Sequence, residues 1–251
     1  MQRTLPARLY GDPDAYDRER KDVFGHAWLF LGHEAEVPEA GDWIAAEIAG
    51  HRLFMVRGKD GTLRAFHNVC RHRAGPLVQG ERGTCPGELT CAYHGWRYAL
   101  DGRLRSAVGF GPAEGFDPRE LGLLGLKLET WRGLVFVSMA EAPEPLCDFI
   151  APLERLIEAR GLRIPGRALR RSHRIGCDWK VYVENYLESY HIASVHPALT
   201  QELGADYRVT VDGDLVIQES LAQGDGPQAG LWGWLWPNLA VNIYRDGAMI
   251  E

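Results

Sequence analysis

Two short motifs place cysteine and histidine together in a pattern that indicates a metal centre. One residue separates Cys70 from His72, two residues separate Cys91 from His94, and residues 73–90 lie between the motifs. A zinc ion would take all four side chains in one tetrahedron. A Rieske-type [2Fe–2S] cluster would divide them, with the cysteines on one iron and the histidines on the other. The single residue between Cys70 and His72 suits ligands of different iron atoms, so the spacing favours the cluster over zinc.

The residues that follow each motif favour tight loops. Gly75-Pro76 follows the first motif and Gly95-Trp96 follows the second. Backbone N–H groups in such loops can face the cluster sulfides, and these hydrogen bonds help to set the reduction potential. The other three cysteines have no patterned histidine neighbours, and we predict ordinary buried thiols for them: Cys85, Cys147 and Cys177.

A second set of candidate ligands lies where we predict a helix over residues 179–193. Glu184, Glu188 and His191 fall at i, i+4 and i+7, so they would share one face of that helix. His191 and His196 are five residues apart, whereas a zinc-binding pair on a regular helix is four apart. Taken alone, the two are more typical of an ordinary helix histidine and a capping histidine. Metal binding by both requires the helix to loosen or end between them.

The first motif pair lies in a region that reads as short strands. Asp12-Pro13 predicts the start of a short helix that ends near Phe24. From residue 28 to residue 138 the chain consists of β-like runs separated by turns. Lys59-Asp60-Gly61 and Asp101-Gly102 predict hairpins. Both Cys/His motifs therefore belong to a small all-β domain.

The pattern changes in the C-terminal half. Apolar residues at helical spacing predict a helix over residues 146–157. We interpret the arginine-rich residues 167–174 as the solvated face of a strand that leads to the second predicted helix. Asp212-Gly213 and Asp246-Gly247 then signal hairpins between further strands. The mixture predicts an α+β protein.

Composition excludes several functional classes. The chain has 251 residues, a net charge of −6, a pI of about 5.9 and no basic stripe, so nothing indicates a nucleic-acid partner. No apolar run reaches the ~18 residues of a membrane span, and the N-terminus lacks a signal-peptide core. Five cysteines, two of them in metal-type motifs, do not form a secreted disulfide framework. We expect a cytoplasmic protein without membrane contact.

Residues 64–105 resemble the Rieske domain of the Rieske non-haem iron oxygenases. The likeness is densest over residues 64–73 and 91–98 and extends from about residue 5 to the C-terminus. It implies an all-β Rieske [2Fe–2S] domain over residues 28–140 and a helix-grip catalytic domain with an antiparallel sheet over residues 141–251. Residues 1–27 would form a helical segment that packs on the catalytic domain.

The same resemblance extends to a mononuclear iron site. Asn-x-x-Glu-x-x-His-x-x-x-x-His is similar to the family's iron motif, which implies that His191 and His196 bind iron(II). Glu188 would bridge an iron ligand and a cluster ligand of the neighbouring subunit. Many members have Asp at this position, and Glu occurs in enzymes that act on quaternary ammonium compounds. Asn185 matches an Asn close to the iron.

The third iron ligand of the family, usually Asp, has no counterpart in a matching context here. It lies on a C-terminal helix of the family fold, whereas this sequence ends at Glu251 inside a predicted hairpin. Asp206, Asp225 and Asp246 are available carboxylates without the expected surroundings. We therefore expect the catalytic domain to be incomplete in these residues, with normal loading of the cluster and poor loading of the mononuclear iron.

The resemblance implies the terminal oxygenase component of a multicomponent system that assembles as a homotrimer. A reductase containing flavin and an iron–sulfur centre, with or without a ferredoxin, would supply electrons from NAD(P)H. O2 would be used to hydroxylate, dihydroxylate or demethylate a small molecule, either an aromatic acid or a quaternary ammonium compound. An electron carrier, a truncated inactive fragment and a zinc module are the alternatives. The Trp232, Trp234 and Trp236 side chains could attract a quaternary ammonium group, but strand core is the preferred interpretation.

Overall fold

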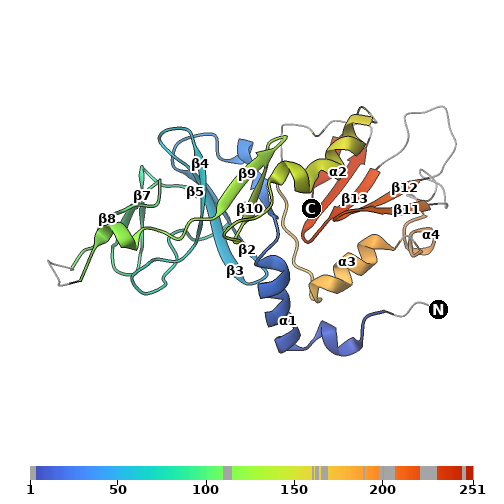
Figure 1. Ribbon diagram of the computed structural model, residues 1–251, viewed down its shortest axis with the longest axis horizontal. Coiled ribbons are helices and arrows are strands. Elements are labelled where there is room, and N and C mark those ends of the chain that lie inside the picture. Colours follow the sequence, from blue (N-terminus) through green and yellow to red (C-terminus); the bar gives the residue numbers. More distant parts are fainter. Residues whose placement is uncertain are drawn as a thin grey trace. The chain divides into compact units, whose positions relative to one another are not determined.

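A computed structural model of the chain separates into two compact units, Phe24–Pro143 and Met1–Val23 with Glu144–Glu251 (Figure 1). Each unit has its own sheets. The structure describes residues 4–109, 115–159, 161, 164, 169–188, 190–197, 200, 207–220, 231–244 and 247–250.

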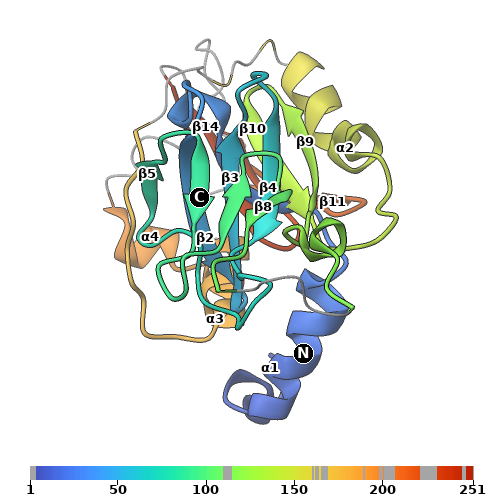
Figure 2. The same cartoon turned by 90° about the vertical axis from the view of Figure 1, so that its left-hand side faces the viewer.

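Three antiparallel sheets build the unit Phe24–Pro143, which confirms the predicted all-β character. Figure 2 shows β2, β3 and β4 side by side. The strand orders are β4-β3-β2-β5, β6-β7-β8 and β1-β10-β9. The strands are β1 (Leu29–His33), β2 (Asp42–Ile48), β3 (His51–Arg57), β4 (Leu63–His67), β5 (Arg82–Thr84), β6 (Glu88–Thr90), β7 (Arg97–Ala99), β8 (Leu104–Ser106), β9 (Lys127–Trp131) and β10 (Leu134–Ser138), with short helical turns η3 (Glu34–Glu36) and η4 (Pro118–Leu121).

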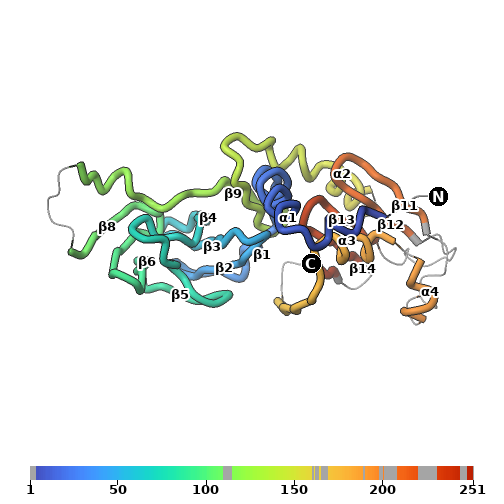
Figure 3. The backbone as a smooth tube through the Cα atoms, turned by 90° about the horizontal axis from the view of Figure 1, so that it is seen from below, coloured from blue at the N-terminus to red at the C-terminus, as the bar shows by residue number. Residues whose placement is uncertain are grey.

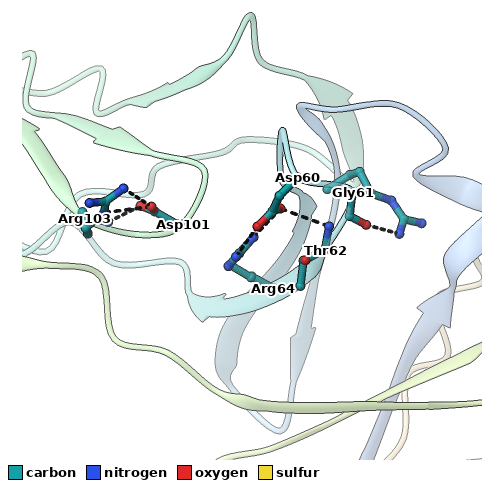
Figure 4. Close-up of polar contacts among 7 residues, drawn as sticks. Asp60, Gly61, Thr62, Arg64, Asp101 and Arg103 are labelled. Atoms are coloured by element: carbon teal, nitrogen blue, oxygen red, sulfur yellow. Dashed lines mark hydrogen bonds and ion pairs between the residues drawn. The ribbon is translucent and has the colours of Figure 1, made fainter.

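The turn between β3 and β4 forms at the predicted Asp60-Gly61 position (Figure 4). Gly61 has a φ of +75°, a backbone conformation that favours glycine. The Asp60 carboxylate accepts the Thr62 N–H at 3.1 Å and pairs with both terminal nitrogens of Arg64 at 2.9 and 2.7 Å. These hydrogen bonds, the Arg64 pair first, hold the pKa of Asp60 below its usual range. The predicted hairpin is confirmed.

The second predicted hairpin joins β7 to β8 through Asp101-Gly102. Gly102 has a φ of +87°, and a Cβ there would lie 2.5 Å from the Phe66 ring. Asp101 pairs with Arg103 at 2.6 Å, as Figure 4 shows. A cavity of about 480 Å³ lies between the two hairpins, and its three carboxylates are each paired with an arginine. It therefore presents no unpaired acid among the described residues.

The second unit contains a meander sheet and a set of helices. All four strand pairs of the order β11-β12-β13-β14-β15 are antiparallel. The N-terminal helix starts as predicted, because the Asp12 side chain caps it by accepting the Asp14 N–H at 3.0 Å. The elements are η1 (Ala7–Tyr10), α1 (Pro13–Glu19), the π-helix η2 (Arg20–Phe24), α2 (Leu146–Ala159), α3 (Trp179–Leu187), α4 (Ile192–Val195), β11 (Tyr207–Asp212), β12 (Leu215–Ser220), β13 (Leu231–Leu235), β14 (Leu239–Tyr244) and β15 (Gly247–Ile250).

Helix α3 covers one face of this sheet. Val183 on α3 packs with Trp234 on β13 and Ala240 on β14 in one buried cluster. Trp234 is only 5% exposed, so the interpretation as strand core is confirmed for this residue, whereas Trp236 beyond β13 is 38% exposed. The opposite face is apolar, and Figure 1 shows α2 and α3 on either side of the strands. Its buried residues are Leu215, Ile217, Leu231, Leu235, Leu239, Val241 and Ile243.

Two expectations about the chain are wrong. Of the strand face predicted over residues 167–174, residues 169–174 have no strand partner among the described residues and are mostly exposed, and residues 167 and 168 lie outside the described residues. Charged side chains there have no apolar partners at alternate positions to bury, so a strand gains little. Cys147 and Cys177 are exposed, and Cys85 is half-buried, rather than all three being buried. Cys147 lies beside buried Leu146 at the start of α2 but on the solvent side of the helix. Among the described residues, no helix has the length and apolar character to cross a membrane.

The start of α3 is anchored by a buried lysine. Lys180 is 7% exposed, and its ammonium group lies 2.9 Å from the carboxylates of Glu19 on α1 and Asp178 before α3. Burial alone would lower the pKa of Lys180, but the hydrogen bonds to Glu19 and Asp178 outweigh it and raise the pKa above 10.5.

Replacing Lys180 by methionine should destabilise this unit by about 3 kcal/mol, because two largely buried carboxylates lose their counter-charge. Denaturant unfolding followed by tryptophan fluorescence measures the change. The raised pKa also means that the wild type loses this contribution as the pH rises above about 10.4, whereas the variant has none to lose. Exposed Lys21→Met is the matched control. Equal unfolding midpoints for the Lys180 variant and the wild type would contradict the expectation.

Candidate metal centres

The two Cys/His loops have the same backbone design. The Cys70 N–H donates to the Gly75 carbonyl at 2.7 Å, and the Ala74 N–H donates to the Cys70 carbonyl at 3.0 Å. The second loop repeats both bonds. The Cys91 N–H donates to the Trp96 carbonyl at 2.9 Å, and the Gly95 N–H donates to the Cys91 carbonyl at 2.9 Å. The fourth residue after each cysteine has positive φ, +57° at Ala74 and +71° at Gly95. The structure thus forms both tight loops that the glycine positions predict.

The four predicted cluster ligands lie together at the meeting point of these loops. Cys70 and Cys91 are each 2% exposed, and burial raises the pKa of the Cys91 thiol. The His72 and His94 ring centroids are 4.4 Å apart. A Cβ on Gly75 would lie 3.4 Å from the Cys91 sulfur, an ordinary contact distance, so the first loop packs directly against the second cysteine. Two sulfur and two imidazole donors in this arrangement fit a [2Fe–2S] cluster.

Aromatic side chains fix the histidine of the first loop. His72 stacks on Trp96 with ring centroids 4.8 Å apart and planes at 7°. Trp96 is 2% exposed and meets Phe116 edge-on at 6.1 Å. Burial, with His94 and Arg73 nearby, lowers the pKa of His72, which favours the neutral imidazole that binds metal.

Two supporting residues were not identified from the sequence. The Tyr98 hydroxyl accepts the Arg71 N–H at 3.1 Å and lies 3.3 Å from the Cys70 sulfur. When Cys70 is a thiolate ligand, the hydroxyl is the donor of this second hydrogen bond. Burial and this contact raise the pKa of Tyr98. Asn68, 6% exposed, accepts the Leu77 N–H at 2.8 Å and spans the first loop. Tyr98 lies within residues 91–98, where the resemblance is densest, but only the fold reveals its contact with Cys70.

Tyr98→Phe should keep the cluster and lower its reduction potential. A hydrogen bond to a ligand sulfur stabilises the more negative, reduced state. A difference of about 1 kcal/mol corresponds to about 40 mV for a one-electron couple. Redox titration followed by visible absorbance measures it, with Tyr93→Phe as control because Tyr93 is 61% exposed. An unchanged potential in Tyr98→Phe would exclude the assigned role.

The second constellation lies beyond the end of α3 rather than on one helix face, which corrects the helix predicted over residues 179–193. Asp178 caps α3, and the helix ends at Leu187 because Glu188 has extended backbone, with φ −101° and ψ 130°. The Glu188 carboxylate accepts the N–H groups of Tyr190 at 2.7 Å and His191 at 3.2 Å. A side chain that takes these amides competes with continuation of the helix.

This break places the two candidate iron ligands at opposite ends of α4. His191 precedes α4 and His196 follows it, with ring centroids 5.2 Å apart. The Glu188 carboxylate lies 2.5 Å from Nδ1 of His191, so the other ring nitrogen remains for a metal. Asn185 is exposed on α3. The two imidazoles, with His191 oriented by Glu188, fit part of a two-histidine, one-carboxylate iron site.

The structure does not supply the remaining carboxylate from the residues that it describes. Among the described residues, no three His, Cys, Asp or Glu side chains surround one point where they could hold a single metal ion. The four side chains of the cluster loops are not such a group, because a [2Fe–2S] cluster divides them between two irons. Asp206, Asp225 and Asp246 lie outside those ranges.

Fold and site together fit a two-centre iron protein, with one iron–sulfur domain and one mononuclear-iron domain. The Rieske [2Fe-2S] domain family matches residues 27–116, and the catalytic domain of the ring-hydroxylating alpha subunit matches residues 165–242.

Relatives agree along nearly the whole chain. The carnitine monooxygenase oxygenase subunit of Escherichia coli (strain K12) is 34% identical over 255 residues, covering 96% of this chain and 67% of that protein. The glycine betaine monooxygenase oxygenase subunit of Pseudomonas aeruginosa (strain UCBPP-PA14) is 36% identical over 200 residues, covering 80% of this chain and 46% of that protein.

Solved structures give the same result. The quaternary ammonium Rieske monooxygenase CntA has a TM-score of 0.81 at 30% identity, covering 96% of this chain and 71% of that chain. Naphthalene 1,2-dioxygenase from Rhodococcus sp. has a TM-score of 0.79 at 25% identity, covering 95% and 64%. The chain belongs to the Rieske oxygenases, as an oxygenase (alpha) component that uses a [2Fe–2S] cluster and mononuclear iron.

Proposed function

We propose that this chain oxidises a small quaternary ammonium compound, by hydroxylation or oxidative demethylation. The observation that carries the proposal is a glutamate, Glu188, at 2.5 Å from His191 at the iron motif. In this respect the chain resembles the enzymes of the family that act on quaternary ammonium compounds, in which Glu occurs at this position. The carnitine and glycine betaine monooxygenase subunits among the relatives support the same substrate class.

The cluster residues divide by donor type. Cys70 and Cys91 hold one iron through thiolates, and His72 and His94 hold the other through neutral imidazoles. Burial of both cysteines and the stacking of His72 on Trp96 keep these donors in fixed positions. When bound, the cluster supplies single electrons and the mononuclear iron activates O2 for transfer to the substrate.

The catalytic residues are assigned separately. His191 and His196 hold the mononuclear iron, and Asn185 lies close to it. Glu188 orients His191 and reaches His94 of a partner subunit, both through charge-assisted hydrogen bonds. This bridge requires an assembly in which neighbouring subunits meet, and the proposed assembly is a homotrimer. The structure of a quaternary ammonium Rieske monooxygenase that matches this chain with a TM-score of 0.80 is described as giving insights into inter-subunit electron transfer in that enzyme.

The proposed partners follow from the electron requirement. A reductase with flavin and an iron–sulfur centre, with or without a ferredoxin, delivers electrons from NAD(P)H in the cytoplasm. A His-ligated cluster lies at about −150 to +300 mV, above the about −400 mV of plant-type ferredoxins, so it accepts electrons from such donors.

An aromatic acid is the second substrate class. The similarity to naphthalene 1,2-dioxygenase, which is named for an aromatic hydrocarbon, supports an aromatic substrate in general. A substrate panel with a reconstituted reductase distinguishes the two classes. We expect oxygen uptake coupled to consumption of carnitine, γ-butyrobetaine, glycine betaine or choline. Coupled uptake with aromatic acids alone would overturn the quaternary ammonium assignment. Substrate-dependent uptake also separates an oxygenase from an electron carrier.

A further inference from the structure

The N-terminal segment contacts α3 at both ends of the helix. Figures 1 and 3 show this segment running beside α3. At the start of α3, Glu19 accepts hydrogen bonds from the Trp179 indole at 2.8 Å and the Lys180 ammonium group at 2.9 Å. Near the end of α3, the Tyr10 hydroxyl donates to the Glu184 carboxylate at 2.6 Å. The helix is therefore held between the sheet on one side and residues 10–19 on the other.

The Tyr10 contact lies one turn before the residue that orients the iron ligand. Glu184 and Glu188 are four residues apart, and the Glu188 N–H donates to the Glu184 carbonyl at 3.1 Å. This bond closes the last turn of α3. Glu188 then turns into extended backbone and binds His191 through its carboxylate. A shift of Glu184 is thus transmitted through one hydrogen-bonded turn to Glu188.

Electrostatics make this turn dependent on an external donor. The C-terminal end of a helix carries partial negative charge, so carboxylates there are unfavourable. Glu184 lies in the last turn and Glu188 at the cap, and α3 has no basic residue in that turn. A helix of nine residues has little stability of its own. The Tyr10 O–H donor offsets the repulsion at this end.

We propose that Tyr10 is a positioning residue for the mononuclear-iron motif, acting through Glu184 on the last turn of α3 and on Glu188. The proposal rests on the proposed role of Glu188 and His191. It gives the N-terminal segment a part in the catalytic site although Tyr10 and Glu184 are 174 residues apart. Tyr10 itself contacts no ligand.

Tyr10→Phe tests the proposal, because it removes the donor and keeps the ring. In the cluster-loaded protein we expect backbone amide exchange at Glu188, Tyr190 and His191 to accelerate about tenfold. Affinity for Co²⁺, used alone as the probe of the His191/His196 site, should fall about tenfold, as is usual when an outer-shell contact is lost. Cluster absorbance should stay at its wild-type value, and the melting temperature should fall by no more than the few degrees that the loss of one hydrogen bond costs. Tyr16→Phe, on α1 and 37% exposed, is the matched control.

Two further variants decide between explanations. Adding Glu184→Gln to Tyr10→Phe should change exchange and Co²⁺ affinity little further, because both changes break one interaction; additive effects would overturn the proposal. His191→Ala should abolish Co²⁺ binding at this site. If it does not, the proposed iron site itself is wrong. If it does, and Tyr10→Phe leaves exchange and affinity unchanged, the positioning role of Tyr10 is wrong.

Discussion

Replacing Glu188 by glutamine is expected to slow product formation about 100-fold while both metal centres stay loaded. The carboxylate lies 2.5 Å from the His191 ring, and its charge strengthens that hydrogen bond and the proposed one to a partner subunit's His94. Glutamine keeps the size and loses the charge. Misplacement of a catalytic group by about 1 Å can cost about 10²-fold in rate, so a weakened bridge has a large effect.

Iron content, cluster absorbance and substrate turnover with saturating reductase measure this result in the same preparation. Glu158→Gln, an exposed change near the end of α2 in the same unit, is the matched control and should keep full activity. Near-normal turnover in Glu188→Gln, with both metals bound, would refute the bridge. Loss of iron together with loss of turnover would instead place Glu188 among the groups needed for metal retention.

Replacing His94 by cysteine should lower the reduction potential of the cluster by about 120 mV or more. Thiolate donates more charge to iron than neutral imidazole does, and all-cysteine plant-type clusters lie at about −400 mV against about −150 mV or above for Rieske centres. Because His72 remains in the variant, one replacement accounts for about half of that difference. A cluster at the lower potential is a poor electron acceptor for the reductase. We therefore expect slow reduction by NAD(P)H with the cluster still present.

Redox titration of the purified variant measures the shift. His51→Cys is the control, since His51 lies on β3 outside both Cys/His loops and should leave the potential unchanged. A potential within about 50 mV of wild type in His94→Cys would show that His94 is not a cluster ligand, because ligand replacement cannot be nearly neutral.

The cluster loops were the most predictable part of the molecule because their information is local. Spacing within each motif and the following glycines determine a loop whose hydrogen bonds span only five residues, as between Cys70 and Gly75. The turns at Asp60-Gly61 and Asp101-Gly102 were predictable for the same reason, since both use backbone conformations that glycine favours. The α+β class followed from the change of apolar period along the chain.

The helix predicted at the iron motif was wrong because residue periodicity does not show when a side chain competes with the helix for backbone N–H groups. Residues 179–193 read as one helix, but the Glu188 carboxylate takes two backbone amides and ends α3 at Leu187. The contact between Tyr98 and Cys70 was missed because a tyrosine at an alternating position reads as core. The contact between Tyr10 and Glu184 joins segments 174 residues apart and has no local signal.

The central claim is that Cys70, His72, Cys91 and His94 hold a Rieske cluster, and one measurement tests it most directly. That measurement is EPR spectroscopy of the anaerobically purified, dithionite-reduced protein, with metal analysis of the same sample. We predict a brown protein whose reduced signal has an average g value below that of all-cysteine ferredoxins, with iron and acid-labile sulfide in equal amounts at the cluster. A colourless, EPR-silent protein with stoichiometric zinc would contradict the account.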